Sequence, residues 1–143
     1  MLAEEIRALE NHWFEAMNKG IASTISEIDE NCAPNVIFHS GLGRDLHGIN
    51  DFKQLFNMFF NAIPDIHFTL EDLIVAGDKA VVRYTFAGTH KGELMGIAPT
   101  NKKVTVSVIE IDHIVGGRLV EGWSKLDTIG FMQQLGVIPT PGK

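Results

Sequence analysis

Three carboxylates of this chain lie in or beside segments that are otherwise mainly apolar: Glu110, Asp112 and Asp127. A carboxyl group held in an apolar pocket has a raised pKa, so it can act as a general acid or base near neutral pH. Each of the three could instead be solvated, or paired across a sheet with Arg83 or Arg118. We expect at least one of them to face a pocket.

Two of these carboxylates belong to a long alternating run that a Gly116-Gly117 turn joins to a second strand, the pattern of a β-hairpin. Alternate residues of a strand share one face, and along one face of this run valines are followed by carboxylates: Val104, Val106, Val108, Glu110 and Asp112. The opposite face becomes apolar only at Ile109 and Ile111. Either a bulge re-aims the strand at this point, or one apolar face opens into a pocket lined partly by carboxylates.

Histidine and cysteine give weaker signals. The six histidines form no HxH or HExxH pattern, so we expect no metal site. His39 ends an apolar run beside a glycine-rich loop, where it either bonds to the loop backbone or faces a pocket. Cys32 lies among the apolar positions of a helical segment, which favours a buried structural thiol.

The elements needed to position these groups can be read from periodicity. Apolar residues at helical spacing predict helices over 2–18, from Ser23 or Thr24 to Pro34, and from an N-cap at Asn50 to Pro64, with a short helix after Asp127. Alternation predicts strands at 36–39, 66–75, 80–90 and in the final hairpin, and 40–48 reads as a loop.

This order of helices and strands indicates one α+β domain over 1–143 with a mostly antiparallel sheet, whose residues 136–143 form an extended tail. A curved sheet with helices on its concave side would enclose one pocket. Most of the aromatic residues are expected to be core, and those nearest the mouth could also form pocket walls. The ligand-binding candidates are Phe38, Phe56, Phe59, Arg83, Tyr84, Phe86, His90, Met95, Val108 and Ser124.

Composition excludes several classes of protein. A net charge of −6 argues against nucleic-acid binding, because no basic cluster could neutralise a run of phosphates. No apolar run approaches bilayer length, and the acidic N-terminal segment lacks the pattern of a signal peptide, so we expect a cytoplasmic protein that does not bind membranes. Phosphate-binding glycine loops and GxSxG are absent from the sequence.

The run PDIHFTLEDLIVAGDKAVVRYTFAGTHKGELMGIAPTNKKVTV, followed by GGRLVEGWSKLDTIGFMQQLG, resembles the SnoaL-like polyketide cyclase (ester cyclase) family. Its most specific pieces are GTHKGELMGIAPT and DTIGFMQQLG. The resemblance implies the cone-shaped α+β barrel shared with ketosteroid isomerase, scytalone dehydratase and nuclear transport factor two. It also implies a homodimer and an enzyme without cofactor or metal, in which an aspartate catalyses an intramolecular aldol ring closure of a polyketide ester.

This sequence departs from the family at the catalytic positions. Aligned on Asp127, the family's acid/base aspartate falls at Ser124, and the histidine of the preceding strand falls at Glu110. A serine cannot replace a carboxylate as general base. The candidate catalytic residues are therefore Asp127 and Glu110, assisted by His39.

Three functions remain open at this point. The chain could be a cyclase, lyase or isomerase acting on a small apolar carbonyl compound. It could also be a binding protein for a small apolar or aromatic molecule that has lost the chemistry. The third alternative is a structural module that dimerises through the outer sheet face, where Ile109, Ile111 and Trp123 could form an apolar patch.

Overall fold

The computed structural model describes residues 2–141, so the last two residues of the predicted tail lie outside the described residues. The helices are α1 (Ala3–Asn18), α2 (Ile21–Asn31), α3 (Gly48–Ala62) and α4 (Thr128–Leu135). The strands are β1 (Cys32–His39), β2 (Asp45–His47), β3 (His67–Ala76), β4 (Lys79–Thr89), β5 (Lys103–Val115) and β6 (Arg118–Leu126). Each predicted helix and strand is present.

The helix ends differ in detail from the prediction. Asn50 is not the N-cap of α3, because the helix already begins at Gly48, where the backbone N–H of His47 donates to the Asp51 carboxylate. Helix α2 begins at Ile21, and the Thr24 hydroxyl donates to the Gly20 carbonyl inside its first turn instead of capping the helix. Of these two helices, it is α3 at whose start a side chain, the Asp51 carboxylate, accepts a backbone N–H, and spacing alone placed both helix starts two or three residues too late.

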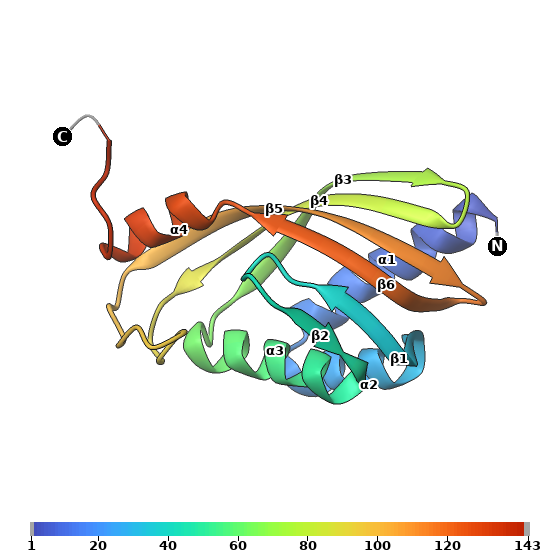
Figure 1. Ribbon diagram of the computed structural model, residues 1–143, viewed down its shortest axis with the longest axis horizontal. Helices are drawn as coiled ribbons and strands as arrows, with labels where there is room; N and C mark the ends of the chain where they lie inside the picture. The colour runs from blue at the N-terminus through green and yellow to red at the C-terminus, as the bar shows by residue number, and fades with distance from the viewer. Residues whose placement is uncertain (1, 142–143) are drawn as a thin grey trace.

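The six strands form one sheet in the order β2-β1-β6-β5-β4-β3 (Figure 1). Strands β1 and β6 run parallel, and every other neighbouring pair is antiparallel. The prediction of an unbroken loop over 40–48 was wrong, because Asp45–His47 turns back and pairs with the end of β1. This short edge strand carries only three residues, of which one is apolar, and so gave no alternating signal.

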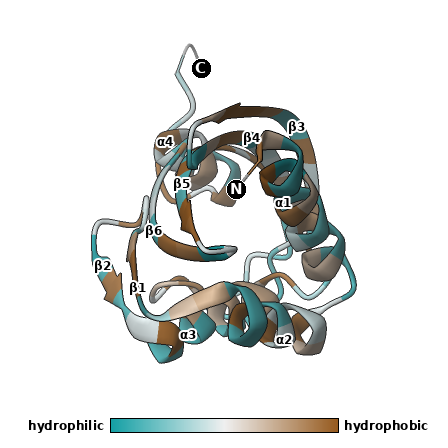
Figure 2. Ribbon diagram, turned by 90° about the vertical axis from the view of Figure 1, so that its right-hand side faces the viewer, coloured by the Kyte–Doolittle hydropathy of each residue, from teal (hydrophilic) through white to brown (hydrophobic). Residues whose placement is uncertain are grey.

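The sheet curves around α1, α2 and α3, which cover its concave face, as Figure 2 shows. It does not close on itself, since β2 and β3 remain edges. The predicted α+β architecture with helices inside a curved sheet is confirmed, and helices, not strands, complete the barrel wall. Within residues 2–141 no helix is long and apolar enough to cross a bilayer.

Strand β5 settles the choice between a bulge and a pocket. It pairs with β4 without a register shift from Lys103 opposite Thr89 to His113 opposite Lys79. The face that holds Val104, Val106 and Val108 therefore continues as the face that holds Glu110 and Asp112. The two carboxylates point to the concave side because the strand is regular.

Candidate active site

The concave side of the sheet borders a cavity of about 90 Å³, lined by residues from α1, α3, strand β1 and the loop after it, and strands β3 to β6. Most of its wall is aliphatic or aromatic. Eight of the residues predicted from the sequence line it: Phe38, Phe56, Phe59, Tyr84, Phe86, Val108, Glu110 and Ser124. A cavity of this composition, with a few polar groups converging on it, is the usual form of a small-molecule site.

Three carboxyl groups meet on the wall of this cavity, and we call Glu10, Glu110 and Asp112 the inner cluster. Glu10 comes from α1, and the other two come from β5. Glu10 and Asp112 are each 4% exposed, whereas Glu110 is half-buried. Tyr84, on the neighbouring strand β4, lines the same cavity. The structure thus brings together two predicted residues, Glu110 and Tyr84, with two acids that complete the cluster.

Burial and crowding of like charges keep the inner cluster protonated. Burial, with a smaller contribution from the charge of Glu10, raises the pKa of Glu110 to about 7, although polar interactions with Asp112 and Tyr84 oppose the rise. Burial and then Asp112 raise the pKa of Glu10 to about 10. The pKa of Asp112 lies well above its usual value, through burial and then Glu110. Near neutral pH, Glu110 is therefore the member that exchanges a proton.

The pairing of β5 with β6 fixes the neighbours of these carboxyls. Glu110 lies directly opposite Ser124, and Asp112 lies opposite Gly122. Opposed residues on one face have Cβ atoms about 5 Å apart. Glu110 therefore occupies the same part of the cavity as Ser124, which is buried.

Gly122 leaves room for the Asp112 side chain. A Cβ atom on Gly122 would lie 2.8 Å from a ring carbon of Phe38 and 3.2 Å from Oδ1 of Asp112. That Oδ1 atom is buried and, among the residues the structure describes, has no hydrogen-bond partner. The Asp112 carboxyl fits at this position because the residue opposite has no side chain.

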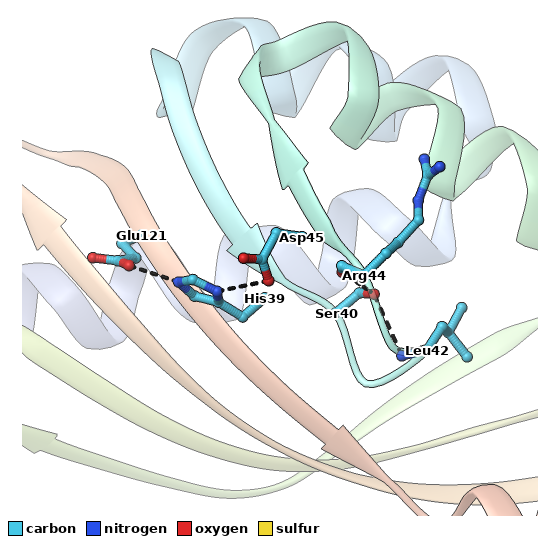
Figure 3. Close-up of polar contacts among 6 residues, drawn as sticks. All are labelled: His39, Ser40, Leu42, Arg44, Asp45 and Glu121. Carbon is cyan, nitrogen blue, oxygen red and sulfur yellow. Dashed lines mark hydrogen bonds and ion pairs between the residues drawn. The ribbon is translucent and has the colours of Figure 1, made fainter.

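The loop between β1 and β2 supplies Ser40, Gly41 and Leu42 to the cavity wall. The Ser40 hydroxyl donates to the Arg44 carbonyl (2.8 Å) and accepts the backbone N–H of Leu42 (3.3 Å), as Figure 3 shows. A Cβ atom on Gly41 would come within 2.5 Å of the Leu126 side chain, so the loop packs closely on the end of β6. Sequence analysis predicted only a glycine-rich loop here and did not predict that it borders the cavity.

His39 does not line the cavity. Its Nδ1 lies 2.8 Å from the Asp45 carboxylate and its Nε2 lies 2.7 Å from that of Glu121 (Figure 3). Its ring stacks on Trp123, with centroids 5.5 Å apart. Its backbone neighbour Phe38 lines the cavity, so the alternation of β1 directs His39 to the other face. Neither predicted alternative was right, since its partners are carboxylates of other strands.

Asp127 also lies away from the cavity. Its side chain caps α4 by accepting the backbone N–H of Gly130 at 2.9 Å, and it is exposed. The N-terminus of a helix needs such an acceptor for its free N–H groups. The structure gives Asp127 the role of a helix cap.

The remaining three predicted ligand-binding residues are outside the cavity lining. Arg83 is exposed, because its position on β4 has the parity opposite to that of Tyr84 and Phe86. His90 is fully buried, and its Nδ1 bonds with the backbone N–H (3.2 Å) and hydroxyl (3.0 Å) of Thr100, which fastens the loop after β4. Met95 is 45% exposed, in that loop.

Glu10 was missed by the sequence analysis, although its signal was present. It lies four residues after Ile6 and three before Trp13, and both are buried on the inner face of α1. A carboxylate at that phase of an amphipathic helix must enter the core with its neighbours. Within residues 2–141 no group of three or more histidine, cysteine, aspartate or glutamate side chains is arranged to hold a metal ion. Ile109 and Ile111 are exposed on β5, and dimerisation through that face stays a prediction.

Comparison with protein families matches residues 7–135 to the SnoaL-like polyketide cyclase model. The chain belongs to this family. The match extends from α1 to the last residue of α4 and so includes every member of the inner cluster. No curated protein shows a significant match to the chain.

Solved structures share the fold along almost the whole chain. TsrD from Streptomyces laurentii is 28% identical, with 96% of this chain and 99% of that one covered and a TM-score of 0.85. AclR, a proposed hydroxylase from Streptomyces galilaeus, is 25% identical, with coverages of 100% and 87% and a TM-score of 0.84. A proposed polyketide cyclase from Bacillus cereus is 28% identical, with coverages of 95% and 83% and a TM-score of 0.77.

Proposed function

We propose that this protein is a polyketide cyclase-like enzyme, a lyase or isomerase in the wider sense, that transfers a proton next to the carbonyl of a small apolar compound. Glu110 is the general base. The proposal needs no cofactor, because the groups required for proton transfer belong to the chain itself. Family membership supports this class of reaction, and the position of Glu110 supports the assignment of the base.

The observation that carries the proposal is the location of Glu110. It faces an apolar cavity, its pKa is about 7, and it lies opposite Ser124, where the resemblance places the family's acid/base aspartate. A base on either of two opposed residues reaches the same region of the cavity. Glu110 can therefore serve where serine cannot, with the carboxylate supplied by β5 instead of β6.

A neighbouring side chain can stabilise the negative charge that proton removal creates. When Glu110 removes a proton from the carbon next to a carbonyl, negative charge develops on the carbonyl oxygen. The Tyr84 hydroxyl lines the same cavity and is a hydrogen-bond donor in a water-poor setting, where such a bond stabilises an oxyanion strongly. The resulting carbanion can attack a second carbonyl of a folded substrate or be reprotonated by Glu110.

Deuterium exchange tests this step without knowledge of the natural substrate. The probe is 2-tetralone in D₂O, with incorporation next to the carbonyl followed by NMR. The rate should rise with pH around a midpoint of about 7, as Glu110 loses its proton. Glu110→Gln should lower the rate about 100-fold or more, since it removes the base and keeps the shape of the side chain.

The matched control is Glu71→Gln, the same chemical change at an exposed position of β3. It should leave the rate unchanged. An exchange rate that Glu110→Gln does not alter would disprove the assignment of the base.

A second candidate function is binding without turnover, and Ser124 favours it, because the family's acid/base position has lost its carboxylate. In that case 2-tetralone binds and shifts the NMR signals of cavity residues, yet the protein does not accelerate exchange at any pH. The same titration therefore separates the two functions.

A further inference from the structure

The polar surface of the cavity contains acids and no fixed positive charge. Glu10, Glu110 and Asp112 line it, and within the part of the chain that the structure describes no lysine, arginine or histidine does. A pocket for an anionic or strongly electron-rich ligand would need the opposite arrangement. The ligand group that meets these acids is therefore a hydrogen-bond donor.

Asp112 shows where that donor would lie. Its side chain is 4% exposed and lines the cavity, and its Oδ1 atom has no hydrogen-bond partner among residues 2–141. A buried acceptor left without a partner is destabilising, and such atoms are rare in folded proteins. Gly122, directly opposite, gives this carboxyl room to pack beside the Phe38 ring.

The rest of the cavity wall suits a cation as well as an apolar body. Nine aromatic side chains contribute to it, from α1, α3, β1, β3 and β4. Aromatic faces attract cations, most strongly in sites from which water is largely excluded. An acid acceptor surrounded by aromatic rings is the arrangement that recognises an ammonium group.

We propose that the deep part of the cavity binds the protonated nitrogen of a small amine, with Asp112 as its principal acceptor and Glu10 beside it. This names a second group on the substrate. The amine site stands without the proposed function, whereas the substrate class derived from it rests on that function. Asp112 and Glu110 are two residues apart on one strand face, a spacing of about 6.8 Å. The substrate class is thus an amino ketone whose nitrogen lies roughly that far from the carbon that loses its proton.

Binding is coupled to loss of a proton. The free cluster holds Asp112 as a neutral acid, so an ammonium ion entering it forms an ammonium–carboxylate pair as one proton leaves for the solvent. The titratable groups that face Asp112 are Glu110 on the same strand, Glu10 on α1, Tyr84 on β4 and Cys32 at the start of β1. Affinity for the amine should therefore rise with pH.

The test compares 2-aminoindane with indane, which have the same ring system and differ by one basic nitrogen. Isothermal titration should show at least about tenfold tighter binding of the amine. Titrations in two buffers of different ionisation enthalpy should show release of about one proton per amine bound. In Asp112→Asn the preference for the amine should disappear while indane still binds, which shows that the cavity is intact.

The control Glu71→Gln should keep the preference. Equal or weaker binding of 2-aminoindane relative to indane would overturn the proposal, and so would a preference that persists in Asp112→Asn. The amine has no carbonyl, so this result is independent of exchange. Amine binding without exchange of 2-tetralone refutes only the proposed function, and exchange without amine preference refutes only this inference.

Discussion

Two groups of carboxylates on opposite faces of the same sheet behave in opposite ways. The inner cluster of Glu10, Glu110 and Asp112 faces an apolar cavity that, within the described residues, no basic side chain lines. The outer network, which we define as His39, Asp45 and Glu121, is partly exposed and holds a histidine between two acids. Acids that are buried together retain protons, whereas acids beside a histidine favour its charged form.

The pKa directions express this difference. Burial raises the pKa values of Glu10, Glu110 and Asp112, and their mutual repulsion adds to the effect. Hydrogen bonds to Glu121 and then Asp45 raise the pKa of His39. Carboxylates thus form a cluster of protonated acids on the inner face and, together with a histidine, an ionic tie between β1, β2 and β6 on the outer face. Burial and the presence of the histidine together decide which of the two results.

The largest expected effect comes from neutralising the inner cluster. The pKa of Glu10 is raised from its ordinary value to about 10, so the folded state keeps a proton that the unfolded chain releases above about pH 4.5. Stability from this group is complete below that pH and is lost as pH rises, by up to about 1.4 kcal/mol per pH unit. Glu10→Gln should therefore be more stable than the wild type at about pH 9, by about 2 kcal/mol or more.

Urea unfolding at a series of pH values measures this difference. Glu4→Gln changes an exposed position of the same helix, so its free energy of unfolding should depend on pH as that of the wild type does. If the free energy of unfolding changes with pH in the same way for the wild type and Glu10→Gln, then Glu10 is ionised in the folded protein. That result would refute the difference in protonation between the two faces of the sheet.

A smaller effect is expected from filling the space beside Asp112. Gly122→Ala places a Cβ atom 2.8 Å from the Phe38 ring and 3.2 Å from Asp112 Oδ1. Overpacking of this kind lowers the free energy of unfolding by about 1–3 kcal/mol. The double variant Gly122→Ala/Phe38→Leu, which removes the ring atoms that clash, should recover part of the loss. Denaturant unfolding that shows no loss in the single variant would mean that the strands move apart freely here.

The smallest effect is expected on the outer face. The raised pKa of His39 means that its contribution to stability is complete below the ordinary histidine pKa of about 6.5 and is lost as pH rises through the raised value. His39→Gln should lower the melting temperature slightly at about pH 6 and leave it unchanged at about pH 9. His67→Gln, at an exposed position of β3, is the control. A deficit that is the same at both pH values would show that stacking on Trp123, and not charge, is what His39 contributes.

Local patterns were sufficient for much of the fold and for part of the site. The alternation of Tyr84, Phe86, Val108 and Glu110 already assigned them to one face of their strands, and the structure places all four in the cavity wall. Arg83 was included among the ligand-binding candidates although alternation along its strand places it on the opposite face from Tyr84 and Phe86. In the structure Arg83 is exposed. Asp127 lies outside the cavity lining and caps α4, because a carboxylate that follows a strand can equally begin a helix.

What the sequence determined by itself was the period and phase of each element: the regular face of β5, the hairpin at Gly116-Gly117, and even the inward phase of Glu10 on α1. These depend on neighbours a few residues apart, and a short segment specifies them. Tertiary structure alone decided that α1 brings Glu10 to Asp112, that Glu110 lies opposite Ser124, and that His39 meets Asp45 and Glu121. Those contacts depend on strand register and sheet curvature, which are set by how distant segments pack against one another.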